Sequence, residues 1–512
     1  MKRILGMILI LNILAVFSGC AMEALPEEGS QLGAYGAAEE KEAVKIPARE
    51  SISMIFYEDM DLNPLTTVNS ENHELLKLVY SPLVRINDSM VAEYVLAESV
   101  ANVDQTVTIK LKKDLKFSDG SKVTASDVGA SFRLVRKTPS SPYYRRLENV
   151  RDYWIEGDRT IVVKLREPDV DFINCLDIPI IKRDGEVGCG PYQFSEKNGK
   201  RVLTPNKHYF ETPSIKTITL KKPADEEERQ DMFSVGLLDV FFLPVESELT
   251  FSGGKDYRVQ TYTGDNLLYL GVNGENSNLK KIGVRQYLSG LLQRKKLVDN
   301  VLLGRGDAAA FPFQPTWYKA AGLSHEKNWS DLDIKGMAER LGFTLEGNRL
   351  LGEEGKPVSF TLLVNKESEI HRNMAAAIAD HWALYGITIK VDAKKKEDYN
   401  AALAEGKYDL YLAEVKTGRT LNTALYAAES PIHFGGINAE KTELAAAQYR
   451  SGKLTLAAFG EEFEKEMPII PLAYRQGVVL ASSDIGDFQS AGTWSIYGNI
   501  SKLKTMEREI SK

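Results

Sequence analysis

Residues 106–137 read TVTIKLKKDLKFSDGSKVTASDVGASFRLVRK, and the rest of the chain is interpreted outward from them. Apolar and polar side chains alternate from Thr106 to Leu111, which predicts a strand with one buried face. Ser118-Asp119-Gly120 predicts a turn, because glycine tolerates the positive φ that other residues resist. Thr124 and Asp127 have the spacing of a capping box at the start of a helix. Three apolar side chains then share one face of that helix: Val128, Phe132 and Val135. The stretch therefore predicts a strand, a turn and an amphipathic helix within an α/β domain.

The same letters, from LKKDLKF to SDVGASF, resemble the signature of the family 5 extracellular solute-binding proteins. These are the oligopeptide, dipeptide and nickel receptors of ABC importers. Further family-like segments follow in the expected order: VGCGPYQF at 187–194, LLYLGVN at 267–273 and PIIPLAY at 468–474. The resemblance implies an α/β, two-lobed periplasmic-binding-protein-like fold of class II. It also implies an extra subdomain in the first lobe and a cleft that closes on the ligand.

Composition sets bounds that agree with this class of protein. The 512 residues exceed one compact core, and 43% apolar with 26% charged residues is ordinary for a globular protein. The net charge of −7 argues against a nucleic-acid partner. Beyond the N-terminus no run approaches the ~18 apolar residues of a membrane span. No cofactor is predicted, and we expect a monomer.

The N-terminus has the pattern of an export signal. Lys2 and Arg3 precede an apolar run from Ile4 to Phe17, and Ser18-Gly19-Cys20 follows. The last residues resemble a bacterial lipobox, with Phe17 where leucine is usual, and this implies cleavage before Cys20 and a lipid on its sulfur. The alternative is an ordinary signal with an incidental cysteine. Residues 21–48 are rich in Ala, Gly and Glu and predict a flexible tether to the membrane.

The expected organisation follows from the order of these segments. We expect a signal peptide at 1–20, a tether at 21–48, a first lobe with an inserted subdomain, and a second lobe. The first lobe takes residues 49–80, 187–266 and 475–512, the inserted subdomain 81–186, and the second lobe 267–474. Cys175 and Cys189 are either two buried thiols or a disulfide that closes a loop of about fourteen residues.

The family pattern suggests candidate ligand contacts at three places before residue 408: the loop at 67–70, Tyr143 and His371. Four small residues follow an Asn-Pro turn where the family chain passes the cleft: Thr67, Val68, Asn69 and Ser70. Tyr143 follows Ser141-Pro142, which aligns with an aromatic residue near the ligand of oligopeptide receptors. His371 begins a predicted helix where an oligopeptide receptor has a histidine near the ligand carboxylate. Each has a structural alternative, namely a loop, core packing or a helix cap.

The strand end at 408–419, YDLYLAEVKTGR, should face the ligand in the second lobe. In peptide receptors an aspartate here holds the ammonium group of the peptide, and that position aligns with Gly418. Glu414 is the nearest acid and is a candidate replacement. Lys416 and Arg419 could instead bind a carboxylate or phosphate, or be solvated charges on a loop. Val415 and Thr417 complete the candidate contacts of this strand.

Cargo is the open question within the binding class. Peptides are the first expectation, with delivery to the permease subunits of an ABC importer. A nickel or other metal chelate is the alternative, because His433 lies near the cleft strand in the sequence. Another small solute, such as an oligosaccharide, is also open, although the aromatic residues are too scattered to support a sugar site. A signalling receptor could use the same fold. No motif of a hydrolase, metalloprotease or nucleotide-binding site is present in a suitable context, so an enzyme is not expected.

Overall fold

The computed structural model describes residues 43–46, 48–183, 187–248, 257–325, 330–352, 355–427, 430, 433–486, 496–497, 503–506 and 508–511. The predicted signal peptide with Cys20, and the tether up to residue 42, lie outside these ranges. The chain divides into a unit of Met1–Ile46 with Glu509–Lys512 and a unit of Pro47–Arg508. In the first, β1 (Ala43–Ile46) pairs with β23 (Arg508–Ser511). The range predicted as tether therefore contains a strand, and the last residues group with it and not with the predicted first lobe.

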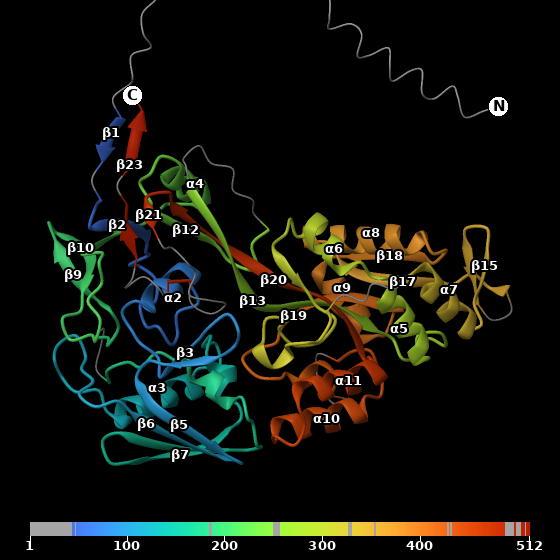
Figure 1. Ribbon diagram of the computed structural model, residues 1–512, viewed down its shortest axis with the longest axis horizontal. Coiled ribbons are helices and arrows are strands. Elements are labelled where there is room, and N and C mark those ends of the chain that lie inside the picture. The colour runs from blue at the N-terminus through green and yellow to red at the C-terminus, as the bar shows by residue number, and fades with distance from the viewer. Residues whose placement is uncertain are drawn as a thin grey trace, which may run out of the picture. The chain divides into compact units, whose positions relative to one another are not determined.

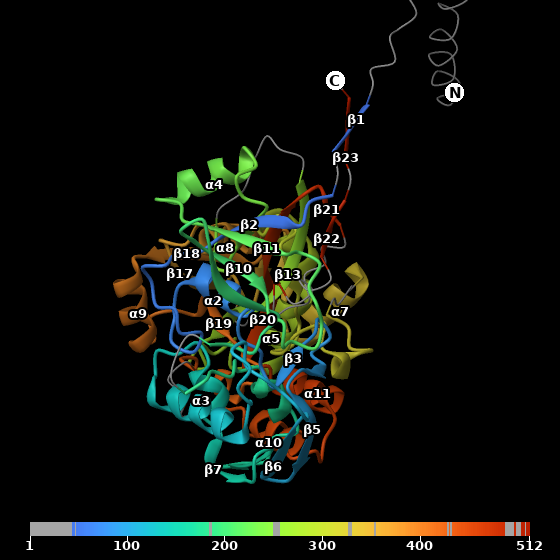
Figure 2. The same ribbon diagram turned by 90° about the vertical axis from the view of Figure 1, so that its left-hand side faces the viewer.

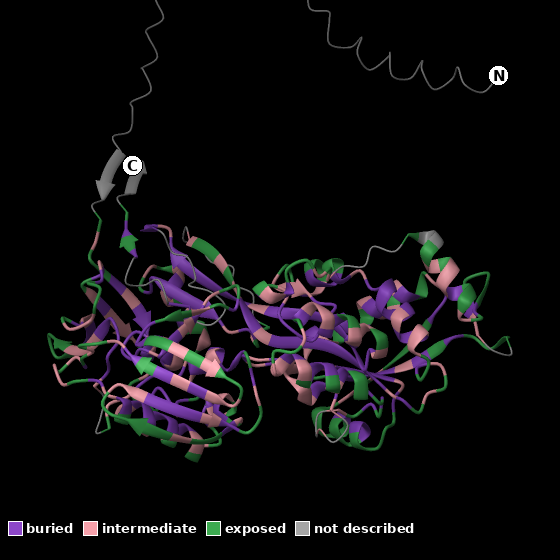
Figure 3. Ribbon diagram, turned by 60° about the horizontal axis from the view of Figure 1, so that its bottom comes forward, coloured by how far each residue is buried: buried purple, intermediate pink, exposed green. Residues whose placement is uncertain are grey.

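Two long antiparallel strands organise the larger unit. β13 (Tyr257–Val272) and β20 (Ile469–Ser482) are neighbours in a seven-stranded sheet of order β12-β20-β13-β19-β17-β18, with β14 added to β20. They pair from Tyr257↔Ser482 to Thr263↔Gln476 and again from Leu267↔Tyr474 to Gly271↔Ile469. The register shifts between Thr263 and Leu267. Figure 1 shows both strands in the middle of the unit, and Figure 3 colours the same ribbon by burial. β20 is buried almost throughout, whereas Tyr257–Tyr262 of β13 is exposed or half-buried.

Each half of this strand pair carries different neighbours. β12 (Val240–Leu243) pairs with the C-terminal part of β20, whereas β19 (Leu410–Lys416) pairs with the C-terminal part of β13. The sequence predicted crossing strands at 267–273 and 468–474, and both are confirmed but longer than predicted. The proposed boundaries at 266/267 and 474/475 fall inside these strands, next to the register shift.

Beyond the register shift, the sheet continues as parallel α/β units. β17 (Ser359–Asn365) is parallel to β18 (Thr388–Lys394) and to β19. α8 (Glu369–Ala383) connects β17 to β18, and α9 (Lys396–Ala404) connects β18 to β19. Ile378 and Trp382 of α8 pack into a core that also holds Leu362 and Leu410. A parallel pair requires such a crossover, so these helices cover the sheet.

The signature stretch forms the predicted strand and helix. β6 (Thr106–Leu111) lies in a sheet of order β5-β6-β8-β7, and α3 (Ala125–Lys137) follows the turn. The Asp127 carboxylate accepts from Thr124 N at 2.8 Å and from Thr124 Oγ1 at 2.7 Å, so the predicted box is present. One core takes apolar side chains from both elements: Val107, Ile109, Leu111, Val128, Phe132 and Val135.

The remaining elements form further sheets and helices of the same unit. A four-stranded sheet has the order β2 (Ser51–Ile55), β11 (Thr217–Lys221), β10 (Lys200–Pro205) and β9 (Tyr192–Lys197). The partners of β6 are β5 (Ala97–Val103), β7 (Val150–Glu156) and β8 (Thr160–Leu165). Other helices are α2 (Ser70–Leu76), α4 (Glu226–Ser234), α5 (Ile282–Leu291), α6 (Arg294–Val301), α7 (Asp331–Arg340), α10 (Glu440–Arg450) and α11 (Leu456–Glu466).

The short strands mostly form hairpins at the periphery. The hairpins are β3 (Val84–Ile86) with β4 (Ala92–Tyr94) and β15 (Thr344–Glu346) with β16 (Arg349–Leu351). β21 (Ile485–Gly486) pairs with β22 (Lys504–Thr505), and β14 is Gly306–Ala308. Figures 1 and 2 both place α10 and α11 on the side of the unit that carries the β5–β8 sheet. No helix in the described ranges is long and apolar enough to cross a membrane.

The two cysteines of the folded part are buried thiols and not a disulfide. Cys175 and Cys189 both pack in the core beneath the signature helix. Burial raises the pKa of each thiol, which keeps both in the unreactive protonated form.

A substitution at Gly271 can test how tightly β13 packs against its neighbour β19. A Cβ there would lie 1.8 Å from the ring of Tyr411 on β19, because that ring covers the glycine. We expect Gly271→Ala to lower the unfolding free energy by ~2 kcal/mol through overpacking, measured by urea denaturation. In the matched control Gly336→Ala on α7, the nearest atom is Arg340 Nη1 at 3.7 Å. The unfolding free energy of the control should rise by about 0.5–1 kcal/mol, because alanine replaces glycine in a helix. Equal stability of the two variants would contradict this packing.

Candidate functional site

The predicted contact residues at the end of β19 lie on two faces of the sheet. Side chains of a strand alternate, so Glu414 and Lys416 point to one face while Val415 and Thr417 point to the other. The first pair contacts charged residues of the loop after β12, of α8 and of β20. Val415 packs against the core that contains the signature helix, and Thr417 is buried. The sequence analysis treated these four residues as one contact surface, and the structure separates them.

Glu414 already has a cationic partner inside the protein. Arg475 Nη1 on β20 lies 3.0 Å and 3.2 Å from its two carboxylate oxygens, and Asn266 Nδ2 donates to it at 2.5 Å. His371 Nε2 lies 3.7 Å away. Burial alone would raise the pKa of Glu414, but His371, Arg475 and Asn266 together hold it below its ordinary value. Glu414 is therefore a buried counter-ion of Arg475, whereas the sequence suggested it as a partner for the ammonium group of a ligand.

Lys416 and Arg419 also have acidic partners. Lys416 Nζ lies 2.6 Å from Glu246, and both side chains are more than half exposed. Arg419 is only 8% exposed, and its Nε donates to Asp177 at 3.0 Å. The alternative that Arg419 is a solvated charge on a loop does not hold, because Arg419 is buried against Asp177 of the inserted segment.

His433 has a structural role in its loop. Its Nδ1 lies 3.2 Å from the carbonyl oxygen of Leu425, and its Nε2 lies 3.2 Å from that of Ile437. The described residues contain no group of three or more His, Cys, Asp or Glu side chains that could hold a metal ion. The surroundings of His433 therefore give no support to the metal-chelate alternative.

The predicted contacts at 67–70 belong to the loop before α2 and its first residue. Val68 is 80% exposed, whereas Thr67 is buried and its Oγ1 has no hydrogen-bond partner in the described chain. Asn69 caps α2 by accepting from Asn72 N at 2.9 Å, and Ser70 donates to Glu71 at 2.9 Å. Asn69 and Ser70 therefore already bond within their own loop and helix.

Tyr143 is buried in the core, and its hydroxyl lies 3.5 Å from His73 Nε2. The Arg146 guanidinium stacks over its ring at 4.6 Å. Burial raises the pKa of Tyr143, which keeps its hydroxyl protonated. The aromatic ring that was expected to reach the ligand is instead packing beneath Arg146, which was the structural alternative.

A buried charge cluster joins the inserted segment to the 417–422 loop, and the sequence analysis missed it. Asp177 accepts from Arg146 Nε at 2.5 Å, from Arg146 Nη2 at 3.1 Å and from Arg419 Nε at 3.0 Å. Burial opposes ionisation of Asp177, but the two arginines hold its pKa well below its usual range. The partners Asp177 and Arg419 are 242 residues apart, so no sequence spacing could indicate them.

A second set of contacts joins the inserted segment to α10 and the 317–319 turn. Asp171 accepts from Lys319 Nζ at 2.5 Å and from the Tyr449 hydroxyl at 2.7 Å. Val170 N donates to the Arg450 carbonyl oxygen at 2.9 Å, and Arg450 Nη2 lies 3.5 Å from Asp169. Burial raises the pKa of Asp169 to about 6, although Arg450 opposes this shift.

Buried polar atoms without a hydrogen-bond partner are found near these contacts. A buried donor or acceptor that lacks a partner costs about 1–3 kcal/mol, so such atoms are uncommon without a function. In the described chain they include Thr67 Oγ1, Gln314 Oε1, Trp317 Nε1, Tyr426 Oη and Tyr474 Oη. Trp317, Tyr426 and Tyr474 belong to the core that also contains the signature helix and packs against Val415. We take the Val415–Thr417 face of β19 as the candidate site because three of these side chains lie in its core, although His371 Nδ1 beside Glu414 also has no partner in the described chain.

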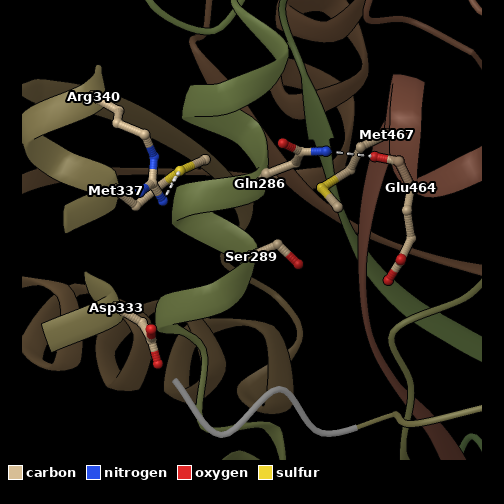
Figure 4. A pocket seen from close by; sticks show the side chains of 7 residues that line it. All are labelled: Gln286, Ser289, Asp333, Met337, Arg340, Glu464 and Met467. Carbon is tan, nitrogen blue, oxygen red and sulfur yellow. Dashed lines mark hydrogen bonds between the residues drawn. The ribbon is translucent and has the colours of Figure 1, made fainter. Parts of the chain in front are cut away.

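A separate pocket lies between α5, α7 and the end of α11 (Figure 4). It has a volume of about 430 Å³ and is lined by Gln286, Ser289, Asp333, Met337, Arg340, Glu464 and Met467. Its polar side chains have internal partners: Gln286 donates to the Glu464 carbonyl oxygen at 2.9 Å, and Ser289 accepts from Arg294 at 2.7 Å. This pocket is not the candidate site.

The Glu414–Arg475 pair yields a stability prediction. Arg475→Met leaves a buried carboxylate without its cation, and we expect a loss of ~3 kcal/mol in the free energy of unfolding. Glu414→Gln should also destabilise, since Arg475 is then unpaired. The double variant should lose less than the sum of the two single losses, measured by urea denaturation. Additive losses would show that the two side chains do not interact.

Asp169 yields a pH prediction. Its carboxyl titrates at about 6 in the folded protein, against the ordinary value of 3.8, so between these values the folded state binds more protons. Its contribution to stability is thus present at low pH and is lost as pH rises through about 6. The free energy of unfolding of Asp169→Asn, relative to wild type, should increase by about 2 kcal/mol from pH ~4.5 to pH ~7.5. Denaturation at both pH values measures this difference. A difference that does not change with pH would contradict the raised pKa.

Comparison with known proteins identifies the family. Residues 92–426 match the model of the bacterial extracellular solute-binding proteins, family 5. The oligopeptide-binding protein AppA of Bacillus subtilis is 27% identical over 64% of this chain and 66% of its own, slightly less than two thirds. The nickel-binding periplasmic protein of Escherichia coli is 24% identical, over 65% of this chain and 69% of its own. A nickel ABC transporter structure from Bacillus halodurans shares the fold, with a TM-score of 0.73, 20% identity, and coverage of 89% of this chain and all of that one. The chain belongs to the bacterial extracellular solute-binding proteins, family 5.

Proposed function

We propose that this protein is the substrate-binding subunit of an ABC importer and that it captures short peptides. The observation that carries the proposal is the set of buried hydrogen-bonding side chains without partners on the Val415–Thr417 face. A peptide backbone alternates donors and acceptors, so it can satisfy groups of both kinds. Membership of family 5 and the oligopeptide-binding relatives support the same cargo.

The chemistry of capture follows from burial. Enclosing a ligand between two parts of a protein removes water from both, so every buried polar group must find a partner. Ligands that match the arrangement are retained, and ligands that leave donors or acceptors unpaired are rejected. The contacts of Asp171 and Asp177 with Lys319, Tyr449 and Arg419 would then hold the enclosing parts together. No step of this process requires covalent chemistry, and we propose no enzymatic activity.

A nickel or other metal chelate is the second candidate, because some relatives are named for nickel. The donor set of the described residues favours the first candidate, since it supplies hydroxyl, amide and indole groups and no cluster of metal-binding side chains. The remaining parts of the proposal follow from the sequence pattern. These are a lipid on Cys20, a location outside the cytoplasmic membrane, a permease partner and a monomeric state.

Native mass spectrometry of the protein purified without refolding tests the cargo. We expect co-purified masses that differ by amino-acid residue masses, because a site that pairs with backbone groups accepts varied side chains. The control is the same sample after partial unfolding and dialysis, which should lose these masses and regain them when a tripeptide mixture is added. A bound mass with the isotope pattern of a metal would contradict the peptide proposal and support the chelate.

A further inference from the structure

Four consecutive residues after β12 contact elements at and beyond the register shift of the long strand pair. β12 ends at Leu243, which pairs with Val478 of β20 on one side of the shift. Residues 245–248 follow, and they contact β13, β20, the end of β19 and the start of α8. We call residues 245–248 the strap, because they join elements on both sides of the shift.

The first residue of the strap packs on the register shift itself. Val245 is 7% exposed, and its side chain lies so close to Gly264 of β13 that a Cβ on Gly264 would come within 2.5 Å of Val245 Cγ2. Gly264 does not have a positive φ, so glycine is needed there for the close approach of Val245 and not for its backbone conformation. The strap therefore begins where the ladder between β13 and β20 is interrupted.

The next two residues of the strap bind cations. Glu246 lies 2.6 Å from Lys416 Nζ at the end of β19, and this ion pair contributes little because both side chains are more than half exposed. The carbonyl oxygen of Ser247 accepts from Arg305 Nη2 at 2.7 Å and from Arg475 Nη2 at 3.3 Å. Arg475 is the buried cation of β20, so this carbonyl connects the strap to the network on the Glu414 face.

The last residue of the strap caps α8. One carboxylate oxygen of Glu248 accepts from Ser368 Oγ at 2.7 Å, and the other accepts from Glu369 N at 3.1 Å. The first N–H groups of a helix have no acceptor within the helix and carry the positive end of its dipole, so they favour a carboxylate. Burial opposes ionisation of Glu248, but Ser368 and the α8 amides hold its pKa below its ordinary value. Glu248 and Ser368 are 120 residues apart in the sequence.

The strap crosses the part of the long pair that is able to bend. The ladder breaks after Thr263 and resumes at Leu267, so residues 264–266 of β13 have no paired residue on β20. A break of this kind bends a strand, and a hinge is a few such residues that absorb a change in backbone angles. Bonds that cross a hinge restrict its angle, since turning the hinge must lengthen or break them.

We propose that the strap is a conformational restraint, which holds α8 and the end of β19 at a fixed angle to β12. A binding protein whose parts are held near one angle has a larger fraction of molecules in a single arrangement. If that arrangement accepts the ligand, the apparent affinity rises in proportion to this fraction. The inference goes beyond the proposed function, because it concerns the angle of the two parts and holds for any ligand.

The competing role for Glu248 is local, as a cap that stabilises α8 and nothing else. A cap affects the free energy of unfolding but leaves the angle between the two parts unchanged. A restraint also affects the spread of that angle in the folded protein. The distribution of distances across the shift therefore distinguishes the two roles.

Single-molecule energy transfer on the full, ligand-free chain measures this distribution. Dyes are attached to ketone-bearing amino acids placed at Glu227 on α4 and at Leu384 after α8, which are both exposed, so the native cysteines stay untouched. In wild type we expect one narrow population. In Glu248→Ala the ratio of other distances to this population should rise by about tenfold, because hydrogen bonds to a charged group are lost. The matched control Glu246→Ala removes only the exposed ion pair and should keep the narrow population.

A second pair of variants tests the strap through Val245, even if Glu248→Ala fails to fold. Gly264→Ala places a methyl group against Val245 and should broaden the distribution by pushing the strap away from β13. Combining it with Val245→Ala makes room for that methyl group and should restore most of the narrow population.

An unchanged distribution in Glu248→Ala, together with a lower free energy of unfolding, would show a helix cap only and overturn the restraint. Equal broadening in Glu246→Ala would overturn the role of the Glu248–α8 contact. Failure of the double variant to narrow the distribution of Gly264→Ala would overturn the role of Val245. No ligand is added, so none of these outcomes depends on whether the protein captures peptides.

Discussion

The pairing of β13 with β20 is the constraint on which the rest of this structure depends. These two strands are the central neighbours that join β12 on one side to β19, β17 and β18 on the other. The register shift between Thr263 and Leu267 interrupts their ladder, and a shift of this kind twists a strand and redirects its side chains. The same strand pair places Arg475 of β20 beside Glu414 of β19.

The alternation of side chains along β19 then separates two kinds of polar group. One face holds Glu414 in a network with Arg475, Asn266 and His371, in which the carboxylate is satisfied. The other face meets Tyr474, Gln314 and Tyr426, which retain polar atoms without partners. A satisfied network makes a rigid support, whereas unsatisfied groups can still gain energy from a ligand. The division lets one strand serve both stability and recognition.

Much of the fold could be predicted from the sequence, and less of the site. Strand periodicity and the Thr124–Asp127 box are local, so β6 and α3 were predicted correctly. The crossing strands were found from the C-terminal half of β13 and the N-terminal half of β20. Tyr257–Tyr262 is exposed or half-buried and has no run of apolar letters, so the length of β13 was missed. Glu414 was recognised as a buried acid, yet its partner Arg475 lies 61 residues further on. Asp177 and Arg419 have no motif that links them, because only tertiary structure brings them together.

The position of β20 near the end of the chain has a consequence for biosynthesis. β20 pairs with β12, β13 and β14, all of which are made much earlier by the ribosome. Until Ile469–Ser482 has been synthesised, those strands have an open edge where their central neighbour belongs. Contacts between residues so distant in sequence form slowly and late. The central sheet therefore cannot be completed before Ile469–Ser482 has been made, and until then the nascent chain lacks the strand that joins β12 to β13.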